Sequence, residues 1–141
     1  MTPKERATKS AAAMWAKDEA SKWFGMELVE VDEGRAVLAL TVAAHHCNGH
    51  GICHGGVTHA LADSAFAFAC NSRNKATVAQ HTMVSYLAPG RLGDRLTAAA
   101  TETAVAGRSG VYDVRVTNQD GIVIAEFRGM SRAIGGQNFD E

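Results

Sequence analysis

One segment of the chain, residues 57–71, limits what the remainder can fold into. It is rich in alanine and contains neither Gly nor Pro, so it is predicted to be a helix. Its faces are apolar almost all round, which is typical of a helix buried inside a domain. Its single charged residue is Asp63. A carboxylate in the middle of a buried helix needs either a polar partner or a chemical role.

The stretch directly before this helix, residues 48–56, is rich in Gly and His. Gly55 and Gly56 would let the backbone approach a ligand closely, and the start of a helix offers unpaired N–H groups. Such N–H groups beside a buried acid are two of the parts that acyl-transfer chemistry needs. A plain loop-to-helix turn and a structural acid at Asp63 are the alternative interpretation, and position alone does not separate the two.

The spacing of these groups constrains any shared chemistry. Gly55 and Asp63 are eight residues apart, which is about 12 Å along one helix axis. An acyl carbon must lie within roughly 3 Å of both the oxyanion donor and the attacking group. One helix cannot supply both to the same carbonyl, but two antiparallel copies can. If the chain is a hydrolase, its site is therefore predicted to be shared between two subunits.

A metal site is the rival interpretation, because His and Cys residues crowd this region. However, no CxxC or HExxH frame is present, and three adjacent side chains of an extended segment cannot all point one way. No GxSxG motif or activated cysteine frame supports a Ser or Cys nucleophile either. The sequence thus favours a site without metal. The residues concerned are His45, His46, Cys47, His50, Cys53, His54 and His59.

The rest of the chain is predicted to form one helix and six strands. Residues 1–25 have helical spacing of apolar residues, and Trp23 and Phe24 are expected to anchor that helix on a sheet. Residues 26–42 read as two strands joined by a turn at residues 32–34. Four further strands are separated by Gly-containing turns, and the tail from residue 135 looks frayed. These strands are residues 76–87, 95–106, 110–118 and 122–134.

This order of elements predicts an α+β fold in a single domain, residues 1–141. Strands joined by short turns form an antiparallel sheet, and a helix that is apolar all round needs a curved sheet wrapped around it. One copy of such a sheet leaves open edges and one uncovered side. Pairing with a second copy is therefore expected.

Composition excludes several classes of function. The net charge is −1, with 14 basic and 15 acidic residues, so neither a nucleic-acid surface nor a membrane tether is predicted. No apolar run is long enough to span a bilayer, and the N-terminus lacks a signal core. The odd number of cysteines, three, fits a reducing, cytoplasmic setting better than a secreted one.

Several short motifs occur here in a fixed order. They are Asn48, His54-Gly55-Gly56, Asp63 within residues 60–66, and residues 86–90, 110–114 and 127–129. Together they resemble the signature of the hotdog-fold acyl-CoA thioesterases, in particular of the phenylacetate-degradation (PaaI) branch. The resemblance covers roughly residues 23–134. It implies a curved antiparallel sheet around one central helix, and hydrolysis of aryl-acetyl-CoA thioesters such as (hydroxy)phenylacetyl-CoA.

The resemblance also implies roles for four residues. Asp63 corresponds to the nucleophile or to the general base that activates water. The backbone N–H of Gly55 binds the thioester oxygen, and Asn48 orients water or substrate. His54 steadies the turn and helps to polarise the thioester. The sites of this family lie at dimer interfaces, commonly within a dimer of dimers.

CoA is part of the substrate, and no separate cofactor is implied. The resemblance places CoA along residues 86–91 and the loop at residues 107–110, with the arginines as phosphate partners. Two departures from the family stand out. Ala79 occupies the place where some relatives carry a water-assisting Ser, and His59 replaces an apolar residue one turn before Asp63. The expected CoA-binding residues are Tyr86, Pro89, Gly90, Arg91, Gly107, Arg108, Ser109 and Gly110.

Other functions stay open from the sequence alone. A non-catalytic acyl-CoA-binding protein could share this fold, and a thioesterase could act on medium- or long-chain fatty acyl-CoA. A dehydratase is a third alternative, although hotdog hydratases usually need a differently placed His and acid pair.

Overall fold

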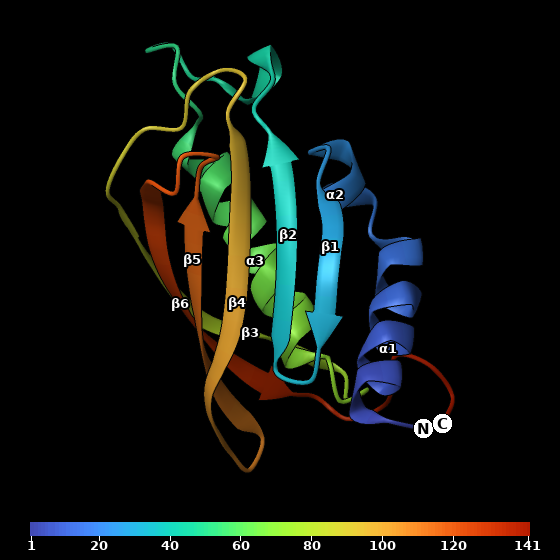
Figure 1. Ribbon diagram of the computed structural model, residues 1–141. Helices are drawn as coiled ribbons and strands as arrows, with labels where there is room; N and C mark the ends of the chain where they lie inside the picture. Colours follow the sequence, from blue (N-terminus) through green and yellow to red (C-terminus); the bar gives the residue numbers. More distant parts are fainter.

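The computed structural model describes residues 1–141, and its elements follow nearly the predicted order (Figure 1). The long apolar segment forms helix α3, which the sheet curves around. Short connections join the strands, and a single 3-10 turn, Ala44–His46, precedes the Gly/His-rich stretch. The helices are α1 (Pro3–Lys17), α2 (Glu19–Trp23) and α3 (Gly55–Cys70), and the strands are β1 (Glu27–Asp32), β2 (Arg35–Thr41), β3 (Thr77–Tyr86), β4 (Arg95–Ala106), β5 (Ser109–Thr117) and β6 (Val123–Ala133).

The six strands form one antiparallel sheet in the order β1-β2-β4-β5-β6-β3. β3 follows α3 in the chain but lies at the far edge, where its only strand partner is β6. Helix α3 therefore lies across one face of the sheet, while α1 packs beside β1 at the opposite edge (Figure 1). This layout is the curved antiparallel sheet around one helix that the sequence predicts.

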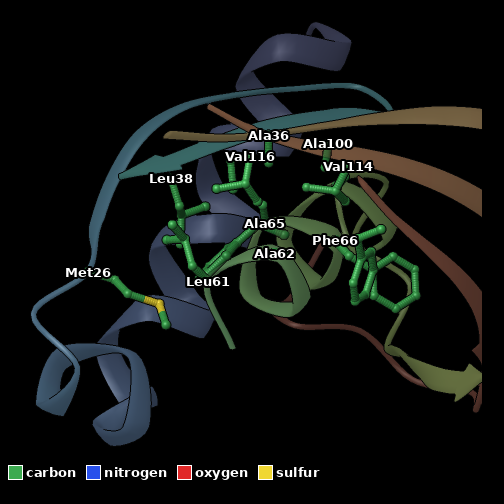
Figure 2. Packing of buried hydrophobic residues seen from close by; sticks show 14 of the residues in the cluster. Met26, Ala36, Leu38, Leu61, Ala62, Ala65, Phe66, Ala100, Val114 and Val116 are labelled. Carbon is green, nitrogen blue, oxygen red and sulfur yellow. The ribbon is translucent and has the colours of Figure 1, made fainter. Parts of the chain in front are cut away.

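The core forms where α3 meets the middle strands (Figure 2). Leu61, Ala65 and Phe66 of the helix are at most 1% exposed. The facing strand β4 contributes Ala98 and Ala100, whose small side chains let the helix come close to the sheet. Complete burial of side chains this apolar stabilises the fold by about 1.5–3 kcal/mol for each large one. The packing fixes both the position and the rotation of α3.

A glycine on β6 lies against the ring of Phe66 on α3. A Cβ built on Gly129 would lie 2.8 Å from the ring of Phe66. That ring also lies 5.8 Å from the ring of Phe127 and 5.6 Å from that of Tyr112, between centroids. The absence of a side chain at residue 129 thus lets the largest core residue of α3 pack directly on the strand.

The single helix predicted for residues 1–25 is wrong in one respect, because the chain breaks at Asp18. Its side chain accepts hydrogen bonds from the Ser21 N–H at 2.9 Å and from the Ser21 hydroxyl at 2.7 Å. Asp18 thereby caps a second helix, α2, instead of continuing α1. Gly25, with φ +79°, ends the helical region where the sequence predicted the stop.

Two further expectations at the chain ends are wrong. Trp23 does not anchor the helix, since it is 73% exposed, whereas Phe24 packs against the core. The tail is not frayed: the Asn138 Nδ2 donates to the Ser10 hydroxyl at 2.9 Å, and the N–H groups of Asn138 and Phe139 donate to the Asn74 side chain. These contacts join residues that are 64 to 128 positions apart in the sequence, so local sequence patterns do not reveal them.

The close packing at residue 129 gives a stability prediction. Gly129→Ala should lower the free energy of unfolding by about 1–3 kcal/mol, because the new methyl group collides with the Phe66 ring. Urea unfolding followed by circular dichroism measures the change. Gly49→Ala is the matched control, because a Cβ there meets open space, and its effect should stay within about 0.5 kcal/mol. Equal midpoints for the two variants would contradict the packing argument.

Candidate functional site

The turn before α3 is held by backbone pairing and by one amide side chain. Cys47 and Cys53 face each other in an antiparallel bridge, and the Asn48 N–H donates to the Ile52 carbonyl at 2.8 Å. The Asn48 Oδ1 accepts from the backbone N–H groups of His50 at 3.0 Å and Ile52 at 3.4 Å. The oxygen of the Asn48 amide is thus committed to the turn, and its Nδ2 is the end left for a ligand.

His54 caps the start of α3 with its ring. Its Nδ1 accepts a hydrogen bond from the Gly56 N–H at 2.8 Å, and its carbonyl accepts from the N–H of Val57 at 2.9 Å. A ring nitrogen that accepts here carries no proton, so the proton of neutral His54 is on Nε2. The N–H of Gly55 makes no hydrogen bond within the chain. It is a free donor at the positive end of a sixteen-residue helix.

A cavity of about 440 Å³ opens beside this free N–H group. The Tyr86 hydroxyl donates to the Gly55 carbonyl at 2.9 Å, and a Cβ at residue 55 would lie 3.1 Å from the Tyr86 ring. The contact explains why this position suits a glycine. Most of the wall is apolar, with backbone and amide groups at the Gly55 end. The lining residues are Asn48, Ile52, Cys53, Gly55, Thr58, Tyr86, Leu87, Ala88, Pro89, Gly90 and Ile124.

Asp63 does not line this cavity. It lies two helical turns further along α3, half-buried, and its carboxylate accepts no hydrogen bond within the chain. Burial raises the pKa of Asp63 above its ordinary value, and the nearby His59 opposes part of that rise. The structure therefore keeps this unpartnered acid away from the free Gly55 N–H of its own chain.

Gly55, His59 and Asp63 lie on one partly exposed stripe of α3. Each is half-buried, and so are Ala60 and Ser64 beside them, whereas the opposite helix face is fully covered by the sheet. The stripe borders the open edge of the sheet, because the His59 Nε2 lies 3.2 Å from the Thr82 hydroxyl on β3. The acid and the donor thus share one uncovered surface without sharing a pocket.

The residues expected to bind CoA fall into separate places in a single chain. Tyr86, Pro89 and Gly90 line the cavity, while Arg91 lies just outside it, where its N–H donates to the Asp94 carboxylate at 2.9 Å. The second segment, residues 107–110, forms the β4–β5 hairpin and lines a small hollow of about 70 Å³ with Lys75. That hairpin lies at the opposite end of the molecule from the start of α3 (Figure 1).

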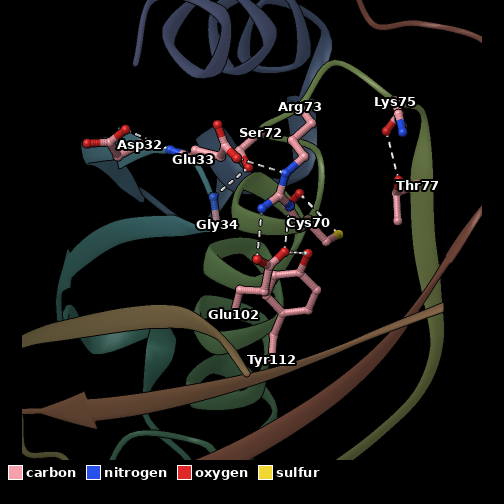
Figure 3. Close-up of polar contacts among 11 residues, drawn as sticks. Asp32, Glu33, Gly34, Cys70, Ser72, Arg73, Lys75, Thr77, Glu102 and Tyr112 are labelled. Carbon is pink, nitrogen blue, oxygen red and sulfur yellow. Dashed lines mark hydrogen bonds and ion pairs between the residues drawn. The ribbon is translucent and has the colours of Figure 1, made fainter. Parts of the chain in front are cut away.

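A network of polar side chains links the end of α3 to the sheet near this hairpin (Figure 3). The Arg73 guanidinium donates to both carboxylate oxygens of Glu102, at 2.5 and 2.8 Å, and the Tyr112 hydroxyl donates to the same carboxylate at 2.9 Å. The Arg73 guanidinium holds the pKa of Glu102 below its ordinary value, although partial burial opposes this. Burial and the Glu102 carboxylate raise the pKa of Tyr112. The network fixes the end of α3 to the sheet.

Two of the histidines that suggested a metal site make other hydrogen bonds. The buried His46 ring accepts the Ala43 N–H at 2.9 Å and contacts the Phe24 carbonyl at 2.7 Å, and the His54 ring caps α3. No group of three or more His, Cys, Asp or Glu side chains is arranged to hold a metal ion. The three cysteines are free thiols. Burial raises the pKa of Cys70 to about 12, which keeps that thiol protonated.

The sequence did not single out part of the cavity wall. Ile52, Thr58, Leu87 and Ile124 come from four separate segments. Thr58 offered a signal, as a polar residue in an apolar helix next to the glycines. Leu87 falls within residues 86–91, where the resemblance placed CoA, but nothing local distinguishes Ile124 from an ordinary strand residue. In addition, no helix has the length and apolar character needed to cross a membrane.

Comparisons with known proteins give the family context. The model of the thioesterase superfamily matches residues 50–125. The chain is 44% identical over 131 residues to the acyl-coenzyme A thioesterase PaaI of Escherichia coli K12, covering 93% of this chain and 94% of that protein. The solved structure of the E. coli PaaI protein from the phenylacetic acid degradation operon superposes with a TM-score of 0.95, at 43% identity, covering 96% of this chain and 99% of that one.

A more distant structure shares the same architecture. The smu.793 protein of Streptococcus mutans, solved with bound acetyl CoA, superposes with a TM-score of 0.77 at 25% identity. The match covers 79% of this chain and 90% of that one. These similarities confirm the predicted hotdog fold and the resemblance that the motifs carried.

The Arg73–Glu102 network predicts a pH-dependent contribution to stability. Glu102→Gln should lower the free energy of unfolding by about 1–2 kcal/mol at pH 7, because the charge-assisted hydrogen bonds are lost. The folded pKa of Glu102 lies below the unfolded one, so its contribution is complete above the unfolded value and disappears as pH falls through the folded value. Urea unfolding at several pH values between neutral and acid measures this contribution. The difference in unfolding free energy between the wild type and Glu102→Gln should become smaller as the pH falls.

The control for this experiment is Glu27→Gln. Glu27 pairs with Arg95 on the surface, and both side chains are largely exposed. An exposed pair contributes at most about 1 kcal/mol and usually less. A difference for Glu102→Gln that stayed constant with pH, or that matched the control, would contradict the assigned role of the network.

Proposed function

The chain belongs to the thioesterase superfamily and is a thioester hydrolase, and from this premise we propose that its substrates are aryl-acetyl-CoA thioesters such as phenylacetyl- or hydroxyphenylacetyl-CoA. The name of the E. coli relative and the operon of its solved structure support this substrate class. The reaction yields the free acid and CoA, needs no further cofactor, and takes place in the cytoplasm.

One observation carries the proposed mechanism: the free Gly55 N–H lines a cavity that Asp63 of the same chain does not reach. The N–H group stabilises the negative charge that develops on the thioester oxygen, and the helix dipole adds to this effect. The acid must come from a second copy, whose α3 runs antiparallel. The Asn48 Nδ2 positions the water or the thioester at the same end.

The second copy's Asp63 completes the reaction in one of two ways. As a nucleophile it attacks the thioester carbon; the C–S bond breaks, CoA leaves, and water hydrolyses the resulting anhydride. As a general base it takes a proton from water, whose oxygen attacks the same carbon. Ala79 on β3 offers no hydroxyl to assist either route. The raised pKa of Asp63 suits proton abstraction near neutral pH.

The open edge of the sheet supports self-association. β3 pairs on one side only, and its exposed side chains include Val78 at 46% and Met83 at 59%. An unpaired strand with exposed apolar side chains is a template for pairing with another chain. A two-fold arrangement there covers β3 and the exposed stripe of α3 together, forming a dimer that can assemble further into a dimer of dimers.

This arrangement also brings the two CoA-binding segments together. When the two α3 helices run antiparallel, the hairpin of one copy moves to the end where the cavity of the other opens. CoA then extends from Tyr86, Pro89 and Gly90 of one subunit past Arg91 toward residues 107–110 of its twin. Arg108 and Lys75 supply positive charge for its phosphates.

A mixing experiment tests the shared site. Asp63→Asn and Gly55→Pro should each lower kcat by at least about 10²-fold, because one lacks the ionisable acid and the other lacks the N–H donor. Proline suits the first helical position, so α3 should still form. Co-expressed in equal amounts, the two variants should recover about a quarter of wild-type activity, since half of random dimers carry one intact site.

Gly55→Ala is the control for the proline variant, because it adds a similar Cβ beside Tyr86 yet keeps the N–H donor. It should retain far more activity than Gly55→Pro. Absence of any recovery in the mixed sample, with both chains folded and associated, would place the donor and the acid in the same chain and reject the shared site.

The substrate class is tested with a panel of thioesters and a free-thiol assay. kcat/KM should be at least about tenfold higher for phenylacetyl- and hydroxyphenylacetyl-CoA than for octanoyl- or palmitoyl-CoA, because a largely apolar cavity of about 440 Å³ beside Gly55 suits a single aryl ring better than a long acyl chain. Faster thiol release from octanoyl- or palmitoyl-CoA would identify the chain as a fatty acyl-CoA thioesterase. Tight binding without thiol release from any substrate would instead indicate an acyl-CoA-binding protein.

A further inference from the structure

His59 lies halfway between the two groups that the proposed site combines. It follows Gly55 by four residues and precedes Asp63 by four, so all three share one stripe of α3. Its ring is held in place by the sheet: Nε2 lies 3.2 Å from the Thr82 hydroxyl, and the ring meets Phe127 edge-on at 5.4 Å between centroids. The ring is half-buried and leaves one side exposed.

The register of two antiparallel helices fixes what faces this ring. If Gly55 of one copy faces Asp63 of the other, each step forward along one helix is a step back along its twin. The two-fold axis then passes through the midpoint of that span, which is residue 59. Each His59 consequently faces its own copy, with one Asp63 about one helical turn to either side.

Few other charges surround this position. The strands packed against His59 present Thr82 and Phe127 to it, and neither is charged. The charged neighbours on β6 alternate to the other face of the sheet, where Glu126 pairs with Arg115 and Arg128 pairs with Asp113. On β3, His81 likewise lies on the exposed side, next to Thr82 in the strand. Asp63 is therefore the only charged group that faces His59 on its own helix.

We propose that the two His59 rings meet on the dimer axis between the paired active sites, and that a proton held by this pair of rings favours the ionised form of both Asp63 carboxylates. This role rests on the proposed shared site and makes His59 a positioning residue, because it acts through Asp63 and not on the substrate. Histidine is the side chain that gains its charge between neutral and acid pH. The attraction of His59 for Asp63 already opposes the effect of burial within one chain.

Cross-linking tests the geometry. His59→Cys, treated with copper-phenanthroline, should form a disulfide-linked dimer on a non-reducing gel, because residues on a two-fold axis face their own copies. Val29→Cys is the matched control: it is 55% exposed on β1, at the other edge of the sheet, and should stay monomeric on the gel. The wild-type chain, treated alike, shows any background from its own three cysteines.

The pH profile of kcat/KM tests the charge. His59→Gln keeps a donor for the Thr82 hydroxyl but cannot become positive, and His59→Phe keeps an aromatic ring against Phe127. Both should move the acid limb to higher pH by about half a pH unit, because Asp63 is then protonated more easily. This corresponds to about a threefold loss of activity on that limb. If His59 had only a structural role, the acid limb of His59→Gln or His59→Phe would coincide with that of the wild type.

The outcomes separate this inference from the proposed function. Recovery of activity in the Asp63→Asn and Gly55→Pro mixture together with an unlinked His59→Cys protein would reject the axis position while keeping the shared site. A linked dimer with an unmoved acid limb would reject the charge role. Failure of the mixture would reject the shared site itself.

Discussion

The rigidity of α3 is the constraint on which the rest of this protein depends. A helix fixes Gly55 and Asp63 about 12 Å apart, and the sheet that grips its other faces prevents any bending that would bring them together. The donor has a cavity and no acid, whereas the acid has a raised pKa and no partner. Gly55 at the start of α3 and Asp63 at its middle are thus two halves of a site that one chain cannot join. In the proposed dimer, a second antiparallel copy supplies the missing half to each, so one contact yields two sites.

The proposed shared site requires that α3 is only partly buried within its own chain. A helix wholly enclosed by its own sheet would bury Asp63 without a partner, which costs several kcal/mol or forces the acid to stay neutral. The chain avoids this by leaving one stripe uncovered, where Gly55, Ala60 and Ser64 keep the surface low enough for another helix to approach. In the proposed dimer, this uncovered stripe is the surface that the second copy covers.

Local patterns predicted most of this fold, since each element carries its own signal. The apolar run marked α3, glycine-containing turns marked the strands, and residues 95–106 were placed within the correct bounds. The failures have a common cause. The capping of α2 by Asp18, the exposure of Trp23 and the hydrogen bonds of Asn138 all depend on neighbours that only the folded chain provides. The cavity wall is similar, because Leu87 and Ile124 meet Gly55 only after the strands pair.

The sequence predicts the individual site residues to different degrees, because some carry a local signal and others acquire their neighbours only in the folded chain. Gly55, Asp63 and Asn48 stand out because a polar group or a glycine in an apolar context needs an explanation, and spacing alone showed that two of them could not act within one chain. His59 stands out only as a departure from the family, a histidine in place of an apolar residue one turn before Asp63, and that position does not reveal what the side chain does. Its meaning comes from symmetry: only when the acid of one copy is set against the donor of the other does the midpoint residue acquire its own twin as a neighbour. In the proposed dimer, a side chain at that point is a neighbour of both active sites.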